Sequence, residues 1–371
     1  MILAGRPDQV VSERAFLPEF TTRSLRGLLS QWQTAIQTVE RARRQRQKVR
    51  QALTRWDKIM TRIAKLLEQT LFRPVWEAIS RWELRAMTLI PCGGLHVFPL
   101  HLLRSGGDGN APCLLDVLEV RYAPSLELLK QSAAQKNLAP GTFLGVCNPT
   151  GDLPAASSEV ETAAKLFRCS KLLKESEATV ANVLAEAPFH DVVHLACHGT
   201  LNLRNPYNSF LILAPPLAWN TAAATGERDG EPPKLLLSAD REGFAIRGEA
   251  WALWQMLRDL PEMKARLVVL SACKSGLVAP DRLPDEYASL PAAFIAARTR
   301  AVISTLWNVD DVATSKLMSE FYRQWIDLGH SPARALQEAQ RWLRALPQYE
   351  HYYYWGGFQF TGDSQPPREV G

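Results

Sequence analysis

The spacing of hydrophobic and polar positions changes near residue 86. Before it, apolar residues recur three or four positions apart, which predicts amphipathic helices; examples are Leu28, Leu29, Trp32, Ile36, Val39, Leu53, Trp56, Met60 and Ile63. After it, short apolar runs end at Gly, Pro or Asn, which is typical of buried strands. The change predicts a helical N-terminal region followed by a second domain of different architecture.

Strands and helices are predicted to alternate in the second domain. The apolar runs predict strands at residues 86–92, 115–122, 142–147, 191–197, 210–213, 267–270, 301–306 and 355–361. Helical patterns lie at residues 157–167, 250–260, 290–298, 311–328 and 331–346, the last with Ser331 as N-cap and Pro332 at its first position. This alternation predicts an α/β fold whose sheet is mostly parallel, with helices on both faces.

Composition narrows the class of protein. The chain has 371 residues, of which 46% are hydrophobic and 22% charged, as in globular proteins. No apolar run approaches the roughly 18–20 residues of a membrane span, and the N-terminus lacks a signal pattern, so we expect a cytoplasmic protein without membrane contact. The six cysteines show no CxxC spacing, which argues against a disulfide framework and a zinc ribbon.

Two polar segments stand out. Residues 41–50 carry six positive charges and no acid, within a chain of net charge +5. We favour a solvated helix or an exposed turn between helices, because charge runs usually face water. The alternative is a contact for nucleic acid or for an acidic partner, although no aromatic residues are interleaved with the charges. Residues 217–247 are polar and irregular, and a loop this long inside a domain is usually functional or mobile; an activation or autocleavage loop is one hypothesis.

Two predicted strands end in residues that support nucleophilic catalysis. His198 and Gly199 follow the strand at 191–197, and Cys273 follows the strand at 267–270. Ligands and chemistry collect at the carboxyl ends of strands in an open α/β sheet, and adjacent parallel strands would bring these residues together. A thiol nucleophile needs a histidine partner, and a glycine lets a backbone N–H approach a substrate carbonyl closely. The pair changes Cys273 from a core thiol into a candidate nucleophile.

The sequence around these residues resembles a known peptidase family. The segments VVHLACHG (192–199) and LVVLSAC (267–273) are similar to the catalytic blocks of caspase-like cysteine peptidases, which include caspases, gingipains and separases. The likeness is greater to the CHAT domain, and it extends to IPCGGLHVFPLH (90–101), AVISTLWNVDD (301–311) and HYYYWGGF (351–358). The resemblance covers about residues 70–363 and implies a caspase-like sheet between helices. We therefore expect a helical extension over residues 1–70 and the caspase-like domain over residues 71–371.

The resemblance also implies catalytic roles. Cys273 would be the nucleophile, His198 the general acid and base, and the backbone N–H groups of Gly199 and Cys273 the oxyanion hole. No metal and no cofactor are implied. Lys274 departs from the Glu or Gln that the family often has; a cation there would lower the pKa of the thiol or alter a structural contact.

The substrate pocket is less well determined by the resemblance. Trp307, Asn308 and Asp310 correspond to the segment that contacts the substrate residue before the cut. In caspases and separases the residue after the tryptophan is arginine for acidic substrates and aspartate for basic ones. Asn308 is neutral, so neither preference carries over. Asp310 and Asp311 would favour a basic residue, unless one of them caps the following helix.

The implied function is that of a cysteine endopeptidase that cleaves a specific protein substrate. Family context suggests antiviral defence or programmed cell death in bacteria, with an activating sensor protein that docks on the helical extension. The alternative is a catalytically silent caspase-like scaffold. Other candidate residues have simpler interpretations: His194 as a hydrogen-bonded core histidine, Cys147 and Cys197 as structural thiols, and His96 and His101 as packing residues.

Overall fold

A computed structural model of the chain describes residues 2–6, 9–13, 22–45, 48–105, 111–135, 140–200, 206–216, 238–239, 245–246, 248–263, 265–271 and 289–364. The chain divides into two compact units, Met1–Thr88 with Gly94–Val120, and Leu89–Gly93 with Arg121–Gly371. Helical structure continues past residue 70 as far as Trp82. The domain boundary at residue 70 stays a prediction.

The first unit is mainly helical. Strands β1 (Ile2–Arg6) and β2 (Gln9–Glu13) form an antiparallel pair. They precede α1 (Thr22–Arg44), α2 (Val49–Leu67), a π-helical turn (Glu68–Phe72) and α3 (Arg73–Trp82). The core of this unit contains Trp32 of α1 and Trp56 of α2, whose ring centroids lie 5.7 Å apart, and Phe98, 6.0 Å from Trp32. The helical periodicity of the sequence is thus satisfied by packing of α1 on α2.

An eight-stranded sheet has the order β3-β4-β15-β14-β13-β7-β5-β6. Its strands are β3 (Ala86–Leu89), β4 (Glu119–Tyr122), β5 (Thr142–Cys147), β6 (Cys169–Lys174), β7 (Val192–Ala196), β13 (Leu267–Leu270), β14 (Ala301–Thr305) and β15 (Phe358–Gly362). The division between the two units falls within β3 and β4. From β4 to β6 every pairing is parallel except that of β14 with β15. The prediction of a mostly parallel sheet is confirmed.

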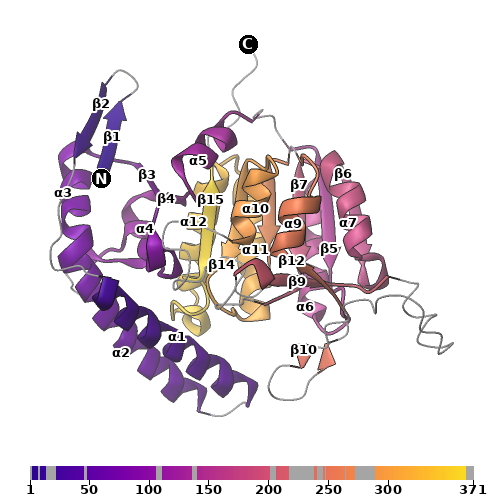
Figure 1. Ribbon diagram of the computed structural model, residues 1–371, viewed down its shortest axis with the longest axis horizontal. Helices are drawn as coiled ribbons and strands as arrows, with labels where there is room; N and C mark the ends of the chain where they lie inside the picture. The colour runs from indigo at the N-terminus through magenta and orange to yellow at the C-terminus, as the bar shows by residue number, and fades with distance from the viewer. Residues whose placement is uncertain are drawn as a thin grey trace. The chain divides into compact units, whose positions relative to one another are not determined.

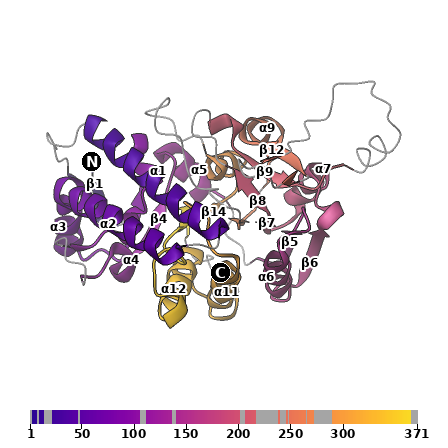
Figure 2. The ribbon, with the colours of Figure 1, turned by 90° about the horizontal axis from the view of Figure 1, so that it is seen from below.

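Helices cover both faces of this sheet, as predicted. Figure 2 shows α6 (Pro154–Ala164), α11 (Asp311–Tyr322) and α12 (Pro332–Arg344) on one face. On the other face lie α5 (Leu126–Ala133), α7 (Val180–Glu186), α9 (Leu253–Asp259) and α10 (Leu290–Ala296). Ser331 caps α12 by accepting from the N–H of Arg334, and Pro332 is its first residue, as the sequence predicts. Central strands buried on two faces explain why their sequences are continuous apolar runs.

A second, three-stranded sheet has the order β12-β9-β8. It consists of β8 (His198–Thr200), β9 (Phe210–Leu213) and β12 (Glu249–Ala252), all antiparallel. Figure 1 shows β9 and β12 side by side, and Figure 2 shows β8 as well. The helix predicted at 250–260 therefore begins only at Leu253, because Ala250–Ala252 pair with β9. The run at 115–122 is likewise split between α4 (Leu114–Val117) and β4. Short apolar runs fit both periods, and only the neighbouring backbone decides between them.

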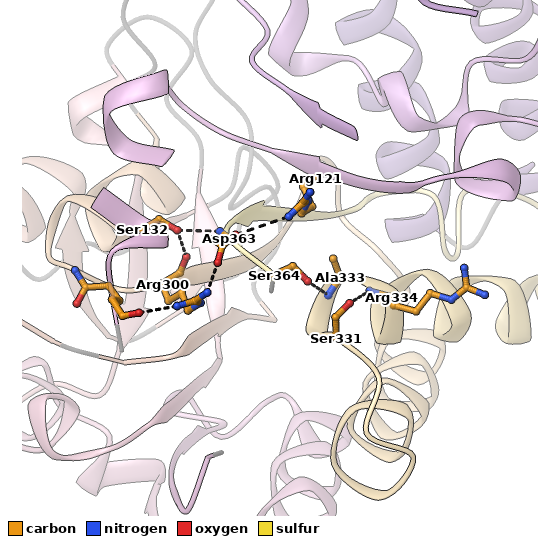
Figure 3. A network of polar contacts seen from close by, with 9 residues as sticks. Arg121, Ser132, Arg300, Ser331, Ala333, Arg334, Asp363 and Ser364 are labelled. Carbon is orange, nitrogen blue, oxygen red and sulfur yellow. Dashed lines mark hydrogen bonds and ion pairs between the residues drawn. The ribbon is translucent and has the colours of Figure 1, made fainter. Parts of the chain in front are cut away.

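Buried polar groups form a network of contacts where the inner strand β14 begins and its neighbour β15 ends. Arg300 and Asp363, both almost fully buried, form an ion pair, and Arg121 lies 3.7 Å from the same carboxylate (Figure 3). Ser132 donates to the carbonyl of Arg300 and accepts from the N–H of Asp363 at 2.8 Å. These contacts lie at the amino-terminal end of β14, opposite the strand ends that carry the candidate chemistry.

Most of the predicted loop at 217–247 lies outside the described residues. Within it, β10 (Ser238–Ala239) and β11 (Ala245–Ile246) form a short antiparallel pair. In the described part of the chain, no helix is both long and apolar enough to cross a membrane.

Candidate active site

Two parallel strands bring the predicted dyad segments to one edge of the sheet. Strands β7 and β13 are adjacent and in register from Val192 beside Leu267 to Leu195 beside Leu270. Both are fully buried, so their ends are held firmly. Beyond β7 the chain continues to His198, and beyond β13 it continues through Ser271 toward Cys273. Cys273 and Lys274 lie outside the described residues, so their predicted roles stay predictions.

His198 stands at the start of β8, where the chain leaves the main sheet. Its backbone pairs with Ile212 of β9, which places Gly199 beside Leu211. The side chain of His198 is 23% exposed, enough to meet a substrate while partly shielded from water. Its Nε2 lies 2.9 and 3.0 Å from the two carboxylate oxygens of Asp152.

Asp152 reaches His198 from the turn that follows β5. Asn148 begins this turn with φ of 53°, a left-handed conformation that asparagine tolerates better than most residues. Its N–H donates to the carbonyl of Ala196 at 3.1 Å, which joins the turn to the end of β7. Its side-chain oxygen accepts from the N–H of Leu153 at 2.7 Å. Gly151, at φ of 79°, lies between Asn148 and Leu153 in this turn. The bonds of Asn148 to Ala196 and to Leu153 therefore hold the turn that carries Asp152.

The environment keeps Asp152 ionised. Partial burial raises the pKa of Asp152, but the hydrogen bond from the Thr150 hydroxyl and the charge and hydrogen bond of His198 together lower it below its ordinary value of 3.8. An ionised carboxylate accepts only, so Nε2 of His198 carries a proton. In the neutral imidazole, Nδ1 then has the free lone pair, which is the form that a general base requires.

The predicted substrate-pocket residues lie in the segment after β14. Trp307 is fully buried, and its indole N–H donates to the carbonyl of Tyr353 at 2.8 Å. A Cβ at Gly357 would lie only 2.9 Å from the Trp307 ring, so this position admits little more than glycine. The backbone carbonyl of Asn308 accepts from the hydroxyl of Tyr353. The tyrosine-rich segment 351–358 therefore holds the loop that contains Asn308.

Asn308 and Asp310 differ in what their side chains do. The side-chain oxygen of Asn308 is buried and has no hydrogen-bond partner among the described residues. Asp310 is the N-cap of α11 and accepts from the N–H of Ala313 at 3.0 Å, so the capping alternative for the Asp310–Asp311 pair holds for Asp310. Substrate contact by Trp307, Asn308 and Asp310 stays a prediction.

Other candidates from the sequence lie in the core. His194 is fully buried, with Nε2 2.9 Å from Glu159 of α6 and Nδ1 3.1 Å from the hydroxyl of Tyr322 of α11. Cys147 and Cys197 are buried, and burial raises the pKa of Cys147 to about 11, which keeps it a neutral thiol. His96 and His101 are also buried. Over the described ranges, no three His, Cys, Asp or Glu side chains gather as metal ligands would.

Comparison with known families identifies the chain. The model of the CHAT domain family matches residues 61–363, which is most of the sequence. The chain belongs to the CHAT domain family. Its central sheet with flanking helices is the caspase-like fold expected from the resemblance.

Two curated proteins are similar to part of this chain. This CHAT domain is 24% identical over 306 residues to tetratricopeptide repeat protein 28 of Homo sapiens, covering 75% of the chain but 12% of that protein. The Mus musculus protein of the same name is 27% identical over 222 residues, covering 57% of the chain and 9% of the relative. The chain thus spans a small part of both.

Two solved structures are similar to this chain. The Arg-specific cysteine proteinase gingipain R superposes with a TM-score of 0.51 at 10% identity, covering 84% of this chain and 68% of the other. The Saccharomyces cerevisiae separase in complex with securin gives a TM-score of 0.49 at 13% identity, covering 75% and 16%. At these identities the gingipain likeness shows the fold alone.

Sequence reasoning missed Asp152 in this CHAT domain. The signal was present: residues 148–152 (Asn-Pro-Thr-Gly-Asp) form a turn directly after the strand that ends at Cys147. β5 is the parallel neighbour of β7, with Cys147 beside Ala196. The rule that brought His198 and Cys273 to one edge would have added Asp152, had the order of the strands been known.

Proposed function

We propose that this CHAT domain is a cysteine endopeptidase in which Cys273 is the nucleophile and His198 the general acid and base. One observation carries the proposal: His198 projects from the carboxyl end of β7 and is held by the Asp152 carboxylate, while the chain leaving the neighbouring strand β13 leads directly to Cys273. A partly exposed histidine whose orientation is set by a third group is the arrangement that activates a thiol.

The reaction would proceed in two stages. The Cys273 thiolate attacks the scissile carbonyl, and a C–S bond forms while the carbonyl oxygen takes the charge. The N–H groups of Gly199 and Cys273 would donate to that oxyanion. The C–N bond then breaks, and His198 gives a proton to the leaving amine. In the second stage His198 takes a proton from water, the resulting hydroxide attacks the thioester, and the thiolate is regenerated.

Asp152 supports both stages through His198. Because it is ionised and accepts from Nε2, it holds the imidazole in one tautomer, with Nδ1 free to exchange a proton with the reacting groups. A thiolate beside imidazolium is the reactive ion pair of such peptidases. Asp152 is thus a positioning residue, since its contact is with His198.

We further propose that a protein partner switches the activity on and that the setting is antiviral defence or programmed cell death. The human relative is named for tetratricopeptide repeats, and the matched segment is only 12% of it, so that protein has room for other domains beside the matched segment. A specific protein would be the substrate. Asn308, whose amide oxygen has no hydrogen-bond partner within the part of the chain that the structure describes, would contact the residue before the cut.

Covalent labelling tests the activity. A thiol-reactive peptide probe, applied with and without candidate activators, should label the wild type, while Cys273→Ala abolishes and His198→Ala strongly reduces labelling. Cys92→Ser and Cys169→Ser are matched controls because both thiols are exposed and lie elsewhere. Labelling that persists in Cys273→Ala would favour a non-catalytic interaction module.

A further inference from the structure

Positive charge is concentrated in the two N-terminal helices. Residues 22–67 contain twelve Lys or Arg and two acids, a net charge of +10, whereas the whole chain of 371 residues has +5. The other 325 residues therefore carry a net charge of −5. Asymmetry of this kind within one chain points to an anionic partner for the basic segment.

On α2 the charges form a row, which we call the α2 stripe: Arg55, Lys58, Arg62 and Lys65. All four side chains are exposed, and they recur at alternating spacings of three and four residues. At 100° per residue they fall within an arc of about 80°, and the row is about 15 Å long. The opposite face of α2 is buried through Ala52, Trp56, Ile63 and Leu67. The stripe therefore lies on the surface away from the helix core.

The arrangement of the α2 stripe opposes helix stability. Like charges three or four residues apart repel by about 0.2–0.5 kcal/mol per pair, and the stripe contains three such pairs. Other helices of this chain neutralise their cations: Arg334 and Arg341 of α12 both pair with Glu338, and Arg73 of α3 pairs with Glu77. Within the described residues the four stripe cations form no ion pair. A surface that serves solubility alone would carry positive and negative side chains interspersed.

The surroundings of the stripe indicate which kind of anion it suits. Its neighbours on the exposed face are the uncharged donors Gln51, Thr54 and Thr61. No large hydrophobic residue among the described positions of α1 or α2 is exposed, so the apolar anchors of a membrane-binding helix or a protein interface are missing. The aromatic residues Trp32 and Trp56 are buried and cannot stack on single-stranded bases.

We propose that the α2 stripe binds the phosphate backbone of a double-stranded nucleic acid without reading its sequence. Lysine and arginine together with neutral amide and hydroxyl donors are the groups that contact phosphates. Four phosphate contacts predict a slope of about −3 to −4 for log K against log salt concentration on duplex DNA. This site is separate from the Asp152–His198 contact, so the proposal stands whether or not the chain is a peptidase.

Fluorescence anisotropy with the full chain tests the proposal. Labelled duplexes of about 24 base pairs, one of DNA and one of RNA, would be titrated at several salt concentrations. The wild type should lose about a hundredfold in affinity between 50 and 200 mM salt. The quadruple variant R55Q/K58Q/R62Q/K65Q should bind much more weakly and with a slope flatter by about three to four. Comparing the duplexes shows which nucleic acid is preferred.

A charge-matched variant separates the stripe from net charge. Changing Lys130, Lys165, Arg168 and Lys171 to glutamine removes four exposed cations elsewhere and should leave binding almost unchanged. The stripe variant should melt no lower than wild type, because it removes repulsion and retains good helix formers. Equal losses in the two variants would overturn the proposal. So would binding only to phosphatidylserine vesicles or polyglutamate, which would assign the stripe to a membrane or to an acidic protein.

Discussion

At the scale of residues, the candidate site depends on which ring nitrogen of His198 carries the proton. The carboxylate of Asp152 accepts from Nε2 of His198, and this leaves Nδ1 for the reacting groups. The αL conformation of Asn148 and its bond to Ala196 place Asp152 beside His198. The chemistry of His198 is therefore set by a turn on a neighbouring strand.

Asp152→Asn tests the role of this carboxylate. The amide keeps the shape but loses the charge that fixes the tautomer, so kcat/KM for peptide hydrolysis should fall by about 10²- to 10⁴-fold. The pH profile should change as well, since the variant has no carboxylate beside the imidazole. Because the pKa of Asp152 lies below 3.8, the wild-type contact should persist above about pH 4 and weaken only on further acidification.

Thr150→Val serves as the control for Asp152→Asn. It removes the hydroxyl that helps to keep Asp152 ionised but leaves the carboxylate in contact with His198. A loss smaller than that of Asp152→Asn is expected. Equal pH profiles for Asp152→Asn and wild type would show that Asp152 has no influence on His198.

Asn308→Asp should introduce a preference for basic substrates. The resemblance to caspase-like peptidases implies that a carboxylate at this position selects a basic residue before the cut, whereas the native amide is neutral. A peptide-library cleavage profile should shift toward Lys and Arg by about tenfold or more, consistent with one added charge pair in a shielded pocket. An unchanged profile would remove Asn308 from the substrate pocket. Asn182→Asp, which makes the same change at an exposed position of α7, is the matched control.

At the scale of elements, successive side chains of strand β7 point to opposite faces of the sheet and so pack against different helices. Val193 and Leu195 enter the core shared with α9 and α10, while His194 points toward α6 and α11. His194 contacts Glu159 through Nε2 and Tyr322 through Nδ1. Burial and the nearby Glu159 charge raise the pKa of Tyr322 well above 10, so its hydroxyl keeps the proton that it shares with Nδ1. The contacts of His194 with Glu159 and Tyr322 therefore connect β7 to α6 and α11.

Removing Glu159 should therefore destabilise the fold without touching the candidate site. Glu159→Ala leaves Nε2 of His194 buried with no carboxylate beside it and should cost about 1–3 kcal/mol of unfolding free energy. Glu159→Gln and Tyr322→Phe each retain part of the contact and should cost about 1–2 kcal/mol. Urea unfolding measures these differences. A loss below about 1 kcal/mol for Glu159→Ala would show that the contact contributes little.

At the scale of the whole molecule, the six cysteines should divide into reactive and protected thiols. Cys92 and Cys169 are exposed, whereas Cys113, Cys147 and Cys197 are buried. Burial raises the pKa of both Cys113 and Cys147 to about 11, so at pH 8 on the order of one thiol in a thousand would be ionised. The proposed function adds Cys273 to the reactive group.

Alkylation by iodoacetamide at pH 8, followed by mass spectrometry of each peptide, measures this division. Cys92, Cys169 and Cys273 should react in the folded protein, with Cys273 the fastest. The three buried thiols should react only after denaturation. Rapid alkylation of Cys147 in the folded chain would contradict the burial of β5, and a slow Cys273 would weaken the nucleophile assignment.

Elements with one strong local pattern were predictable. The run at residues 142–147 became β5, and the one at 210–213 became β9, with the predicted bounds. Ser331 and Pro332 marked the start of α12 because caps are local chemistry. Residues 250–252 were wrongly predicted as helix, since their strand depends on pairing with β9. β6, whose residues are largely exposed, had no buried apolar run to reveal it.

The sequence by itself determined the family, the parallel sheet and the two strands after which His198 and Cys273 follow, because strand burial and catalytic chemistry both leave local patterns. Tertiary structure alone decided that β5 lies beside β7, and so that Asp152 meets His198 across 46 positions of sequence. It also decided that Asp310 caps a helix, that His194 is a core residue and that four cations share one face of α2. The physical reason is that these properties depend on which backbone lies next to which, and strand order is a property of the folded chain.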